Sequence, residues 1–215
     1  MTRIRARAGT DAGGWIEIPV LGDDAERDRW AGAVVDAVAR AHGDRFDAEA
    51  GPGIRRVMAE AADDREESDL LVMAFLPTAR PIVATVRVFM MTPSPVDWWR
   101  SHGFALSPIH APGAGHGMLA TRTLEETVDE ERLVAHQTVF IFTDGELDIA
   151  VFIEPTAALV FDRMQEGLIE IVASLTLEFE DGRTFVGARR TELPDSDVDS
   201  WDGTDSWNIG LHVVA

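Results

Sequence analysis

Two stretches of alternating apolar and polar residues flank the dipeptide Asp144-Gly145, and they constrain the fold more than any other feature. Residues 132–143 and 146–154 place apolar side chains at every second position, which is the period of a β-strand with one buried face. Asp-Gly is favoured in type I′ turns because both positions tolerate a positive φ. The sequence therefore predicts an antiparallel hairpin. A two-residue turn would pair Phe142 with Leu147, Phe140 with Ile149, Thr138 with Val151 and His136 with Ile153.

A long amphipathic helix is expected at residues 24–42. Trp30, Val34 and Val38 recur at helical spacing and form an apolar stripe. Asp23 or Asp24 can cap the first turn through a side-chain oxygen. The spacing therefore predicts a helix that packs one face on the core.

A second main helix is expected at residues 156–173, where Met164, Leu168 and Ile171 follow helical spacing. Gly167 interrupts this pattern and should weaken the helix by about 1 kcal/mol relative to alanine. A shorter, frayed helix is expected at residues 54–62.

The remaining patterns complete an α+β domain with a mostly antiparallel sheet, packed by the two main helices. Residues 15–215 are expected to form this single domain after a flexible lead-in of residues 1–14. Residues 103–117 are rich in glycine and proline and predict a long surface loop. Just before it, Ser94 is expected to cap a short helix. Strands are expected near 15–20, 69–76, 81–91, 118–124, 132–143, 146–154, 175–189 and 207–214.

The composition excludes several classes of function. The chain has 38 acidic and 19 basic residues, a formal net charge of −19, which argues against binding to nucleic acid or to anionic lipid. It has no cysteine, and all its basic residues are arginine, so thiolate zinc sites, thiol nucleophiles and P-loop or Schiff-base lysines are excluded. The arginine, alanine and glycine bias is typical of a high-GC bacterial genome. Because no apolar segment follows the basic N-terminal residues, we expect a cytoplasmic protein rather than an exported one.

The order of elements over residues 132–177 resembles the C-terminal half of bacterial Mog1/PsbP-like domains. The hairpin ends in Ile153-Glu154-Pro155 and is followed by a helix that closes on Ile171-Val172-Ala173-Ser174-Leu175. The resemblance implies an α/β sandwich that is used mostly for binding and has no shared catalytic site. It assigns no functional residue to this chain.

Histidines are the most suggestive candidates for chemistry. His102, His110 and His116 fall in one glycine-rich stretch, where their imidazoles could converge on a metal with Asp97 as a fourth ligand. The alternative is a set of solvated loop histidines, because the spacing matches no rigid metal motif. His136 lies on the apolar hairpin face, as a hydrogen-bonded core histidine or as a general base.

Asp195, Asp197 and Asp199 have the alternate spacing of a calcium-binding loop. The pattern then departs from that loop, since Ser200 stands where glycine is needed and Ser206 stands where glutamate is needed. A solvated acidic loop is the alternative, and no metal is assigned.

Trp98 and Trp99 are adjacent on the short predicted helix, so they cannot share a face, and one should be more exposed than the other. An exposed tryptophan can anchor an interface, although both could instead pack at the edge of the sheet.

These patterns favour a non-catalytic module that binds a protein partner or a second copy of itself and needs no cofactor. The high negative charge favours encounters with a basic partner. The alternative is a metal-dependent enzyme that uses the histidine-containing loop at 97–116.

Overall fold

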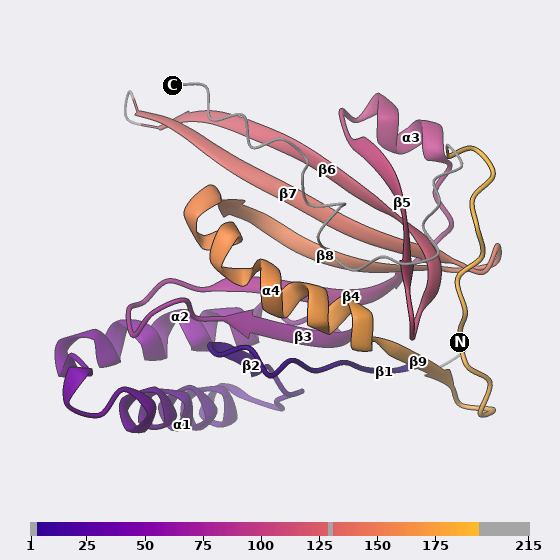
Figure 1. Cartoon of the computed structure of the whole chain (residues 1–215). Coiled ribbons are helices and arrows are strands. Elements are labelled where there is room, and N and C mark those ends of the chain that lie inside the picture. The colour runs from indigo at the N-terminus through magenta and orange to yellow at the C-terminus, as the bar shows by residue number, and fades with distance from the viewer. Residues whose placement is uncertain (1–3, 129–130, 194–215) are drawn as a thin grey trace.

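The computed structural model describes residues 4–128 and 131–193 and has the α+β architecture expected from the sequence (Figure 1). The helices are α1 (Asp24–His42), α2 (Gly51–Asp63), α3 (Val96–Ser101) and α4 (Ala158–Ser174), with short 3-10 turns at Gly43–Arg45 and Ala48–Ala50. The strands are β1 (Ile4–Arg7), β2 (Trp15–Glu17), β3 (Asp69–Phe75), β4 (Ala84–Met91), β5 (Ala105–Ala111), β6 (Gly115–Val128), β7 (Glu131–Thr143), β8 (Asp148–Ala157) and β9 (Thr176–Phe179).

Seven strands form one antiparallel sheet in the order β2-β3-β4-β8-β7-β6-β5. β1 and β9 form a separate antiparallel pair that joins the two ends of the described chain. The prediction of a mostly antiparallel sheet is therefore confirmed. No helix among the described residues is long and apolar enough to cross a bilayer.

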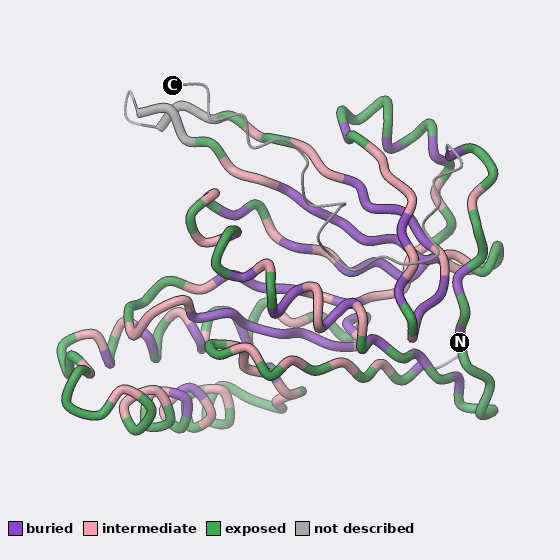
Figure 2. The backbone as a smooth tube through the Cα atoms, in the orientation of Figure 1, coloured by how far each residue is buried: buried purple, intermediate pink, exposed green. Residues whose placement is uncertain are grey.

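The sheet buries both faces, and successive side chains of β3 show how. Leu71 and Met73 point to the large core that α4 covers, where they meet Leu168 and Ile171. The intervening Val72 and Ala74 point to a second core, which α1 and α2 cover. Figure 2 shows buried residues along the middle of the strands and exposed residues on the outer side of α1.

A third core lies on the sheet face opposite α4, toward the β5 edge. There Val96 and Trp99 of α3 pack with Met118 and Ile141 of the central strands. Leu193 joins the same cluster, so the segment after β9 crosses this face. The α1–α2 pair and α3 therefore cover different parts of one face (Figure 1).

The expected helix 24–42 is confirmed with the expected cap. Asp23 Oδ1 accepts a hydrogen bond of 2.8 Å from the backbone N–H of Glu26, which satisfies one of the free donors of the first turn. The expected helix at 54–62 begins three residues earlier, at Gly51, with proline in its first turn.

The β7–β8 hairpin forms, but the predicted register is wrong by two residues. Phe142 pairs with Ile149 and Phe140 with Val151, because the connecting loop spans four residues rather than two. Asp144 N–H donates to the Leu147 carbonyl, which closes that longer loop. A shift of two residues preserves the alternation of faces, so the apolar face is the predicted one.

The prediction of a long loop at 103–117 is wrong, because most of this segment forms the hairpin of β5 and β6. Pro108 is tolerated there since β5 is the edge strand and has a neighbour on one side only. The predicted cap of α3 is also wrong. The Ser94 side chain makes no cap hydrogen bond, and its backbone N–H instead donates to Asp148 Oδ2 at 3.0 Å.

The flexible lead-in expected at 1–14 is wrong for residues 4–7, which form β1 opposite β9. The sequence gives little sign of this strand because its partner lies some 170 residues away along the chain, with Ile4 opposite Phe179. The strand expected at 175–189 is shorter, since β9 ends at Phe179. The strand expected at 207–214 lies outside the described residues.

Candidate functional site

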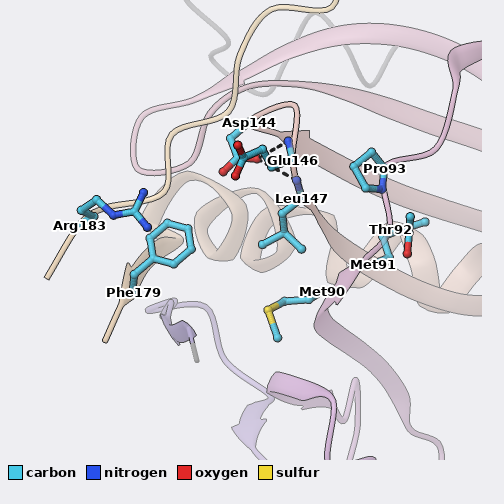
Figure 3. Close-up of a pocket in the computed structure, with 9 residues that line it drawn as sticks. All are labelled: Met90, Met91, Thr92, Pro93, Asp144, Glu146, Leu147, Phe179 and Arg183. Atoms are coloured by element: carbon cyan, nitrogen blue, oxygen red, sulfur yellow. Dashed lines mark hydrogen bonds between the residues drawn. The ribbon is translucent and has the colours of Figure 1, made fainter. Parts of the chain in front are cut away.

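An open cleft of about 450 Å³ lies at the end of the sheet where β4 finishes (Figure 3). Met90 and Met91 of β4 and the following Thr92 and Pro93 form one wall. The β7–β8 loop forms the second wall, and the end of β9 with the turn after it forms the third. We call this the acid-rimmed cleft. It is lined by Met90, Met91, Thr92, Pro93, Asp144, Glu146, Leu147, Phe179 and Arg183.

The floor of the acid-rimmed cleft is apolar. Met90 and Leu147 are partly buried and pack against the main core, and Phe179 belongs to that core. Figure 3 shows these three side chains around the lower part of the cavity, with Asp144 and Glu146 above them. The floor is thus built on the rigid part of the molecule, although the cleft itself is open.

The β7–β8 loop is fixed by its own hydrogen bonds. Asp144 Oδ1 accepts from the backbone N–H groups of Glu146 and Leu147, both at 2.9 Å. Gly145, which lies between Asp144 and Glu146, has a φ of 94°, a conformation that other residues adopt at a cost in free energy. These contacts hold the Asp144 carboxyl group and the backbone of Glu146 at the rim.

Charge at the rim is dominated by acids. Arg183 Nε donates to Asp181 Oδ2 at 2.8 Å, and its guanidinium lies 4.6 Å from the centre of the Phe179 ring. The hydrogen bond from Arg183 lowers the pKa of Asp181, and the same bond raises the pKa of Arg183, with smaller contributions from Asp144 and Glu146. Three carboxylates around one guanidinium leave a local charge of −2.

This arrangement suits a cation with an apolar stem. An arginine or lysine side chain can lay its methylene groups on the floor and keep its charged end among the rim carboxylates. Among the described residues, neither Asp144 nor Glu146 forms an ion pair within 4 Å, so both are available to an incoming cation.

The structure pairs two of the predicted histidines and separates the others. The rings of His110 and His116 face each other across β5 and β6 with centres 4.7 Å apart. His102 follows α3 at the far end of β5, where it stacks on Trp98, and its Nδ1 donates to the Trp98 carbonyl at 2.7 Å. Five residues of strand between Ala105 and His110 span about 17 Å, so His102 does not reach the pair.

His136 lies on the other face of the sheet, near Phe161 of α4 at 6.1 Å between ring centres. Within the described residues, no group of three histidine, aspartate or glutamate side chains is arranged to hold a metal ion. Asp97 forms an ion pair with Arg100, with 3.1 Å between Asp97 Oδ1 and Arg100 Nη1. Asp195, Asp197 and Asp199 lie outside the residues that the structure describes.

The two adjacent tryptophans differ in exposure, as expected. Trp99 is 5% exposed in the third core, whereas Trp98 is 45% exposed. The two rings pack edge to face with their centres 4.9 Å apart. Trp98 is therefore the one large aromatic of α3 that a partner could reach, and His102 already covers one side of its ring.

Comparison with known proteins assigns no family. No family model, curated protein or solved structure matches this chain. The functional argument therefore depends on the geometry of the described residues.

Sequence patterns did not reveal the acid-rimmed cleft. Its walls come from three separate parts of the chain, residues 90–93, 144–147 and 179–183, which meet only through the pairing of β4 with β8 and of β9 with β1. The one available signal was that two Asp-Gly turns, at 144–145 and 181–182, each place carboxylates beside an apolar strand end.

Proposed function

We propose that this protein is a non-catalytic binding module that holds a basic side chain of a protein partner in the acid-rimmed cleft. The observation that carries the proposal is the combination of an apolar floor, Met90 and Leu147, with the unpaired rim carboxylates of Asp144 and Glu146. The resemblance of residues 132–177 to Mog1/PsbP-like domains supports a binding role, since that family is used mostly for binding.

Charge favours a different, basic protein over a second copy of this chain. Each copy carries −19, so two copies repel at long range, while a basic partner is attracted and steered toward the negative rim. The attraction should weaken as ionic strength rises, because the rim is exposed to solvent.

The test uses two short peptides as probes, acetyl-Ala-Arg-Ala-amide and the same peptide with citrulline, which has arginine's shape without its charge. We expect the arginine peptide to shift backbone amide resonances of residues 90–92, 144–147 and 179–183 in a 1H–15N titration. The citrulline peptide should shift them far less. Equal shifts from both peptides, or shifts centred elsewhere, would reject the cleft as a cation site.

A matched pair of variants separates the rim charges from the overall charge. Asp144→Asn/Glu146→Gln removes two charges at the rim, and asparagine keeps the side-chain oxygen that holds the loop. Asp162→Asn/Glu166→Gln removes two charges from exposed positions on α4. Binding of the arginine peptide should be lost in the first variant and retained in the second. Sedimentation of the free protein tests the self-association alternative, which a stable dimer would favour.

A further inference from the structure

A second cleft lies at the other end of β4, and its charge is opposite to that of the whole chain. It has a volume of about 370 Å³ and lies between the end of α1 and the β3–β4 loop. β4 spans eight residues from Ala84 to Met91, a length of about 23 Å, and lies between the two clefts. We call it the arginine-lined cleft. Its lining residues are His42, Arg45, Asp47, Pro77, Thr78, Ala79 and Arg80.

Two arginines and a histidine meet there with a single acid. The chain has twice as many acids as bases, 38 against 19, yet the guanidinium groups of Arg45 and Arg80 form no ion pair or hydrogen bond with any described residue. Some other arginines of the described chain do pair with acids, as Arg55 does with Asp28 at 2.5 Å. The two guanidinium groups in this cleft can therefore bind an anion through charge-assisted hydrogen bonds.

The Asp47 carboxylate is partly engaged within its own turn. Its Oδ1 accepts the backbone N–H of Glu49 at 2.9 Å, which closes the 3-10 turn at Ala48–Ala50. The partial negative charge at the end of α1 is offset by Arg40 and His42 in the last turn. The balance of formal charge in the cleft is thus positive.

A polar group without a partner lies in the same cleft. The Thr78 hydroxyl is buried and makes no hydrogen bond with any described residue, a state that costs free energy. Pro77 and Ala79 add apolar surface beside it.

From this geometry we infer that the arginine-lined cleft binds a phosphate group, either free or carried by a small organic molecule. Guanidinium groups bind phosphate oxygens through paired, charge-assisted hydrogen bonds, and a hydroxyl donor adds a third contact. The volume is at the lower end of the range for small-molecule sites, which allows a phosphate with a sugar-sized body. This inference does not depend on the proposed function, because the two clefts share no residue.

The experiment compares inorganic phosphate, glucose 6-phosphate and glucose as probes of the full chain, by calorimetry and 1H–15N titration. We expect the two phosphates to bind and to shift amides of residues 42–47 and 78–80, and we expect glucose to do neither. Tighter binding of glucose 6-phosphate would assign an organic phosphate, and equal binding would assign free phosphate. Failure of both phosphates to bind at millimolar concentration, or binding of glucose as tight as that of its phosphate, would overturn the inference.

Variants of the two arginines test the assignment to this cleft. Arg45→Gln and Arg80→Gln should each weaken phosphate binding by about tenfold. Both residues are exposed, so the fold should tolerate the change, and thermal unfolding checks this. Arg163→Gln on the exposed side of α4 removes the same charge far from the cleft and should leave binding unchanged. Equal weakening in all three variants would show a general charge effect and reject the site.

Discussion

The indole of Trp15 occupies the space that a side chain at residue 167 would need. A Cβ on Gly167 would overlap the indole, with Trp15 Cδ1 at 2.7 Å. Trp15 in turn packs on Phe75 with ring centres 5.0 Å apart. The glycine that weakens α4 as an isolated helix is therefore what lets β2 and α4 pack closely together.

Gly167→Ala is expected to destabilise the protein by about 1–3 kcal/mol, because the overlap with Trp15 outweighs the gain of about 1 kcal/mol in helix propensity. Gly32→Ala in α1 is the matched control, since the nearest atom to a Cβ there is Arg55 Cζ at 3.9 Å. That control should be neutral or stabilising by up to about 1 kcal/mol. Urea unfolding measures both, and a stabilised Gly167→Ala protein would contradict the close packing.

Asp148 and Arg190 form a buried ion pair that fastens the segment after β9 to the sheet. Asp148 is fully buried, and its Oδ2 accepts from Arg190 Nη2 at 2.9 Å. Arg190 Nη1 also donates to the Ser94 carbonyl at 2.8 Å. Arg190→Leu should lower the free energy of unfolding by about 3–5 kcal/mol, because it leaves the buried Asp148 carboxylate without its counter-ion.

The double variant Asp148→Leu/Arg190→Leu should recover part of that loss, since neither charge remains. Arg183→Leu breaks the exposed pair with Asp181 and should change stability far less. If Arg190→Leu and Arg183→Leu had the same effect, the pair at Asp148 would not be buried as the structure has it.

Gly145→Ala tests the conformation of the β7–β8 loop. The φ of 94° is unfavourable for alanine, while no atom lies within 4 Å of a Cβ there, so the whole effect is conformational. We expect a loss of about 1–2 kcal/mol. Gly145→Asn should cost less, because asparagine tolerates positive φ better. Thermal unfolding distinguishes them, and equal stability of the alanine variant and the parent would argue for another loop conformation.

Glu170 should make stability depend on pH. Hydrogen bonds from the Thr10 hydroxyl and the Asp11 N–H lower the pKa of Glu170 in the folded protein. Stabilisation is therefore present above the unfolded-state pKa and is lost as the pH falls through the lower folded-state pKa.

We expect Glu170→Gln to be less stable than the parent at about pH 7, with the difference shrinking toward about pH 3. Glu166→Gln, an exposed glutamate on the same helix, controls for loss of one negative charge. A difference between Glu170→Gln and the parent that grows on acidification would show the opposite shift and contradict the contact with Thr10.

Two patterns with a short range in the sequence are confirmed by the structure, although the predicted Ser94 cap is not. The cap at Asp23 and the span of α1 depend on contacts between residues three or four apart, so the local sequence predicts them. The burial of the face shared by Phe140 and Phe142 follows from alternation alone. A register that is wrong by two residues therefore still predicts the correct buried face.

Features that join distant segments were not predictable in this way. The local sequence predicts a loop where β5 forms, because glycine and proline dominate its surroundings, and only its place at the sheet edge makes Pro108 acceptable. Helix propensity marks Gly167 as a weakness, whereas the packing of Trp15 requires the absence of a side chain there. His102, His110 and His116 are close in sequence and His136 is on the hairpin face, but the sheet places His102, the His110–His116 pair and His136 apart.

Periodicity, capping and composition are local properties, so the amino-acid sequence alone predicts an α+β fold with an antiparallel hairpin, a capped long helix and a strongly negative charge. Three features emerge in the folded chain alone, namely the pairing of β1 with β9, the register of β7 with β8 and the positions of the two clefts. Each of these depends on which distant surfaces bury one another, and that is settled by packing of the whole chain rather than by any single segment.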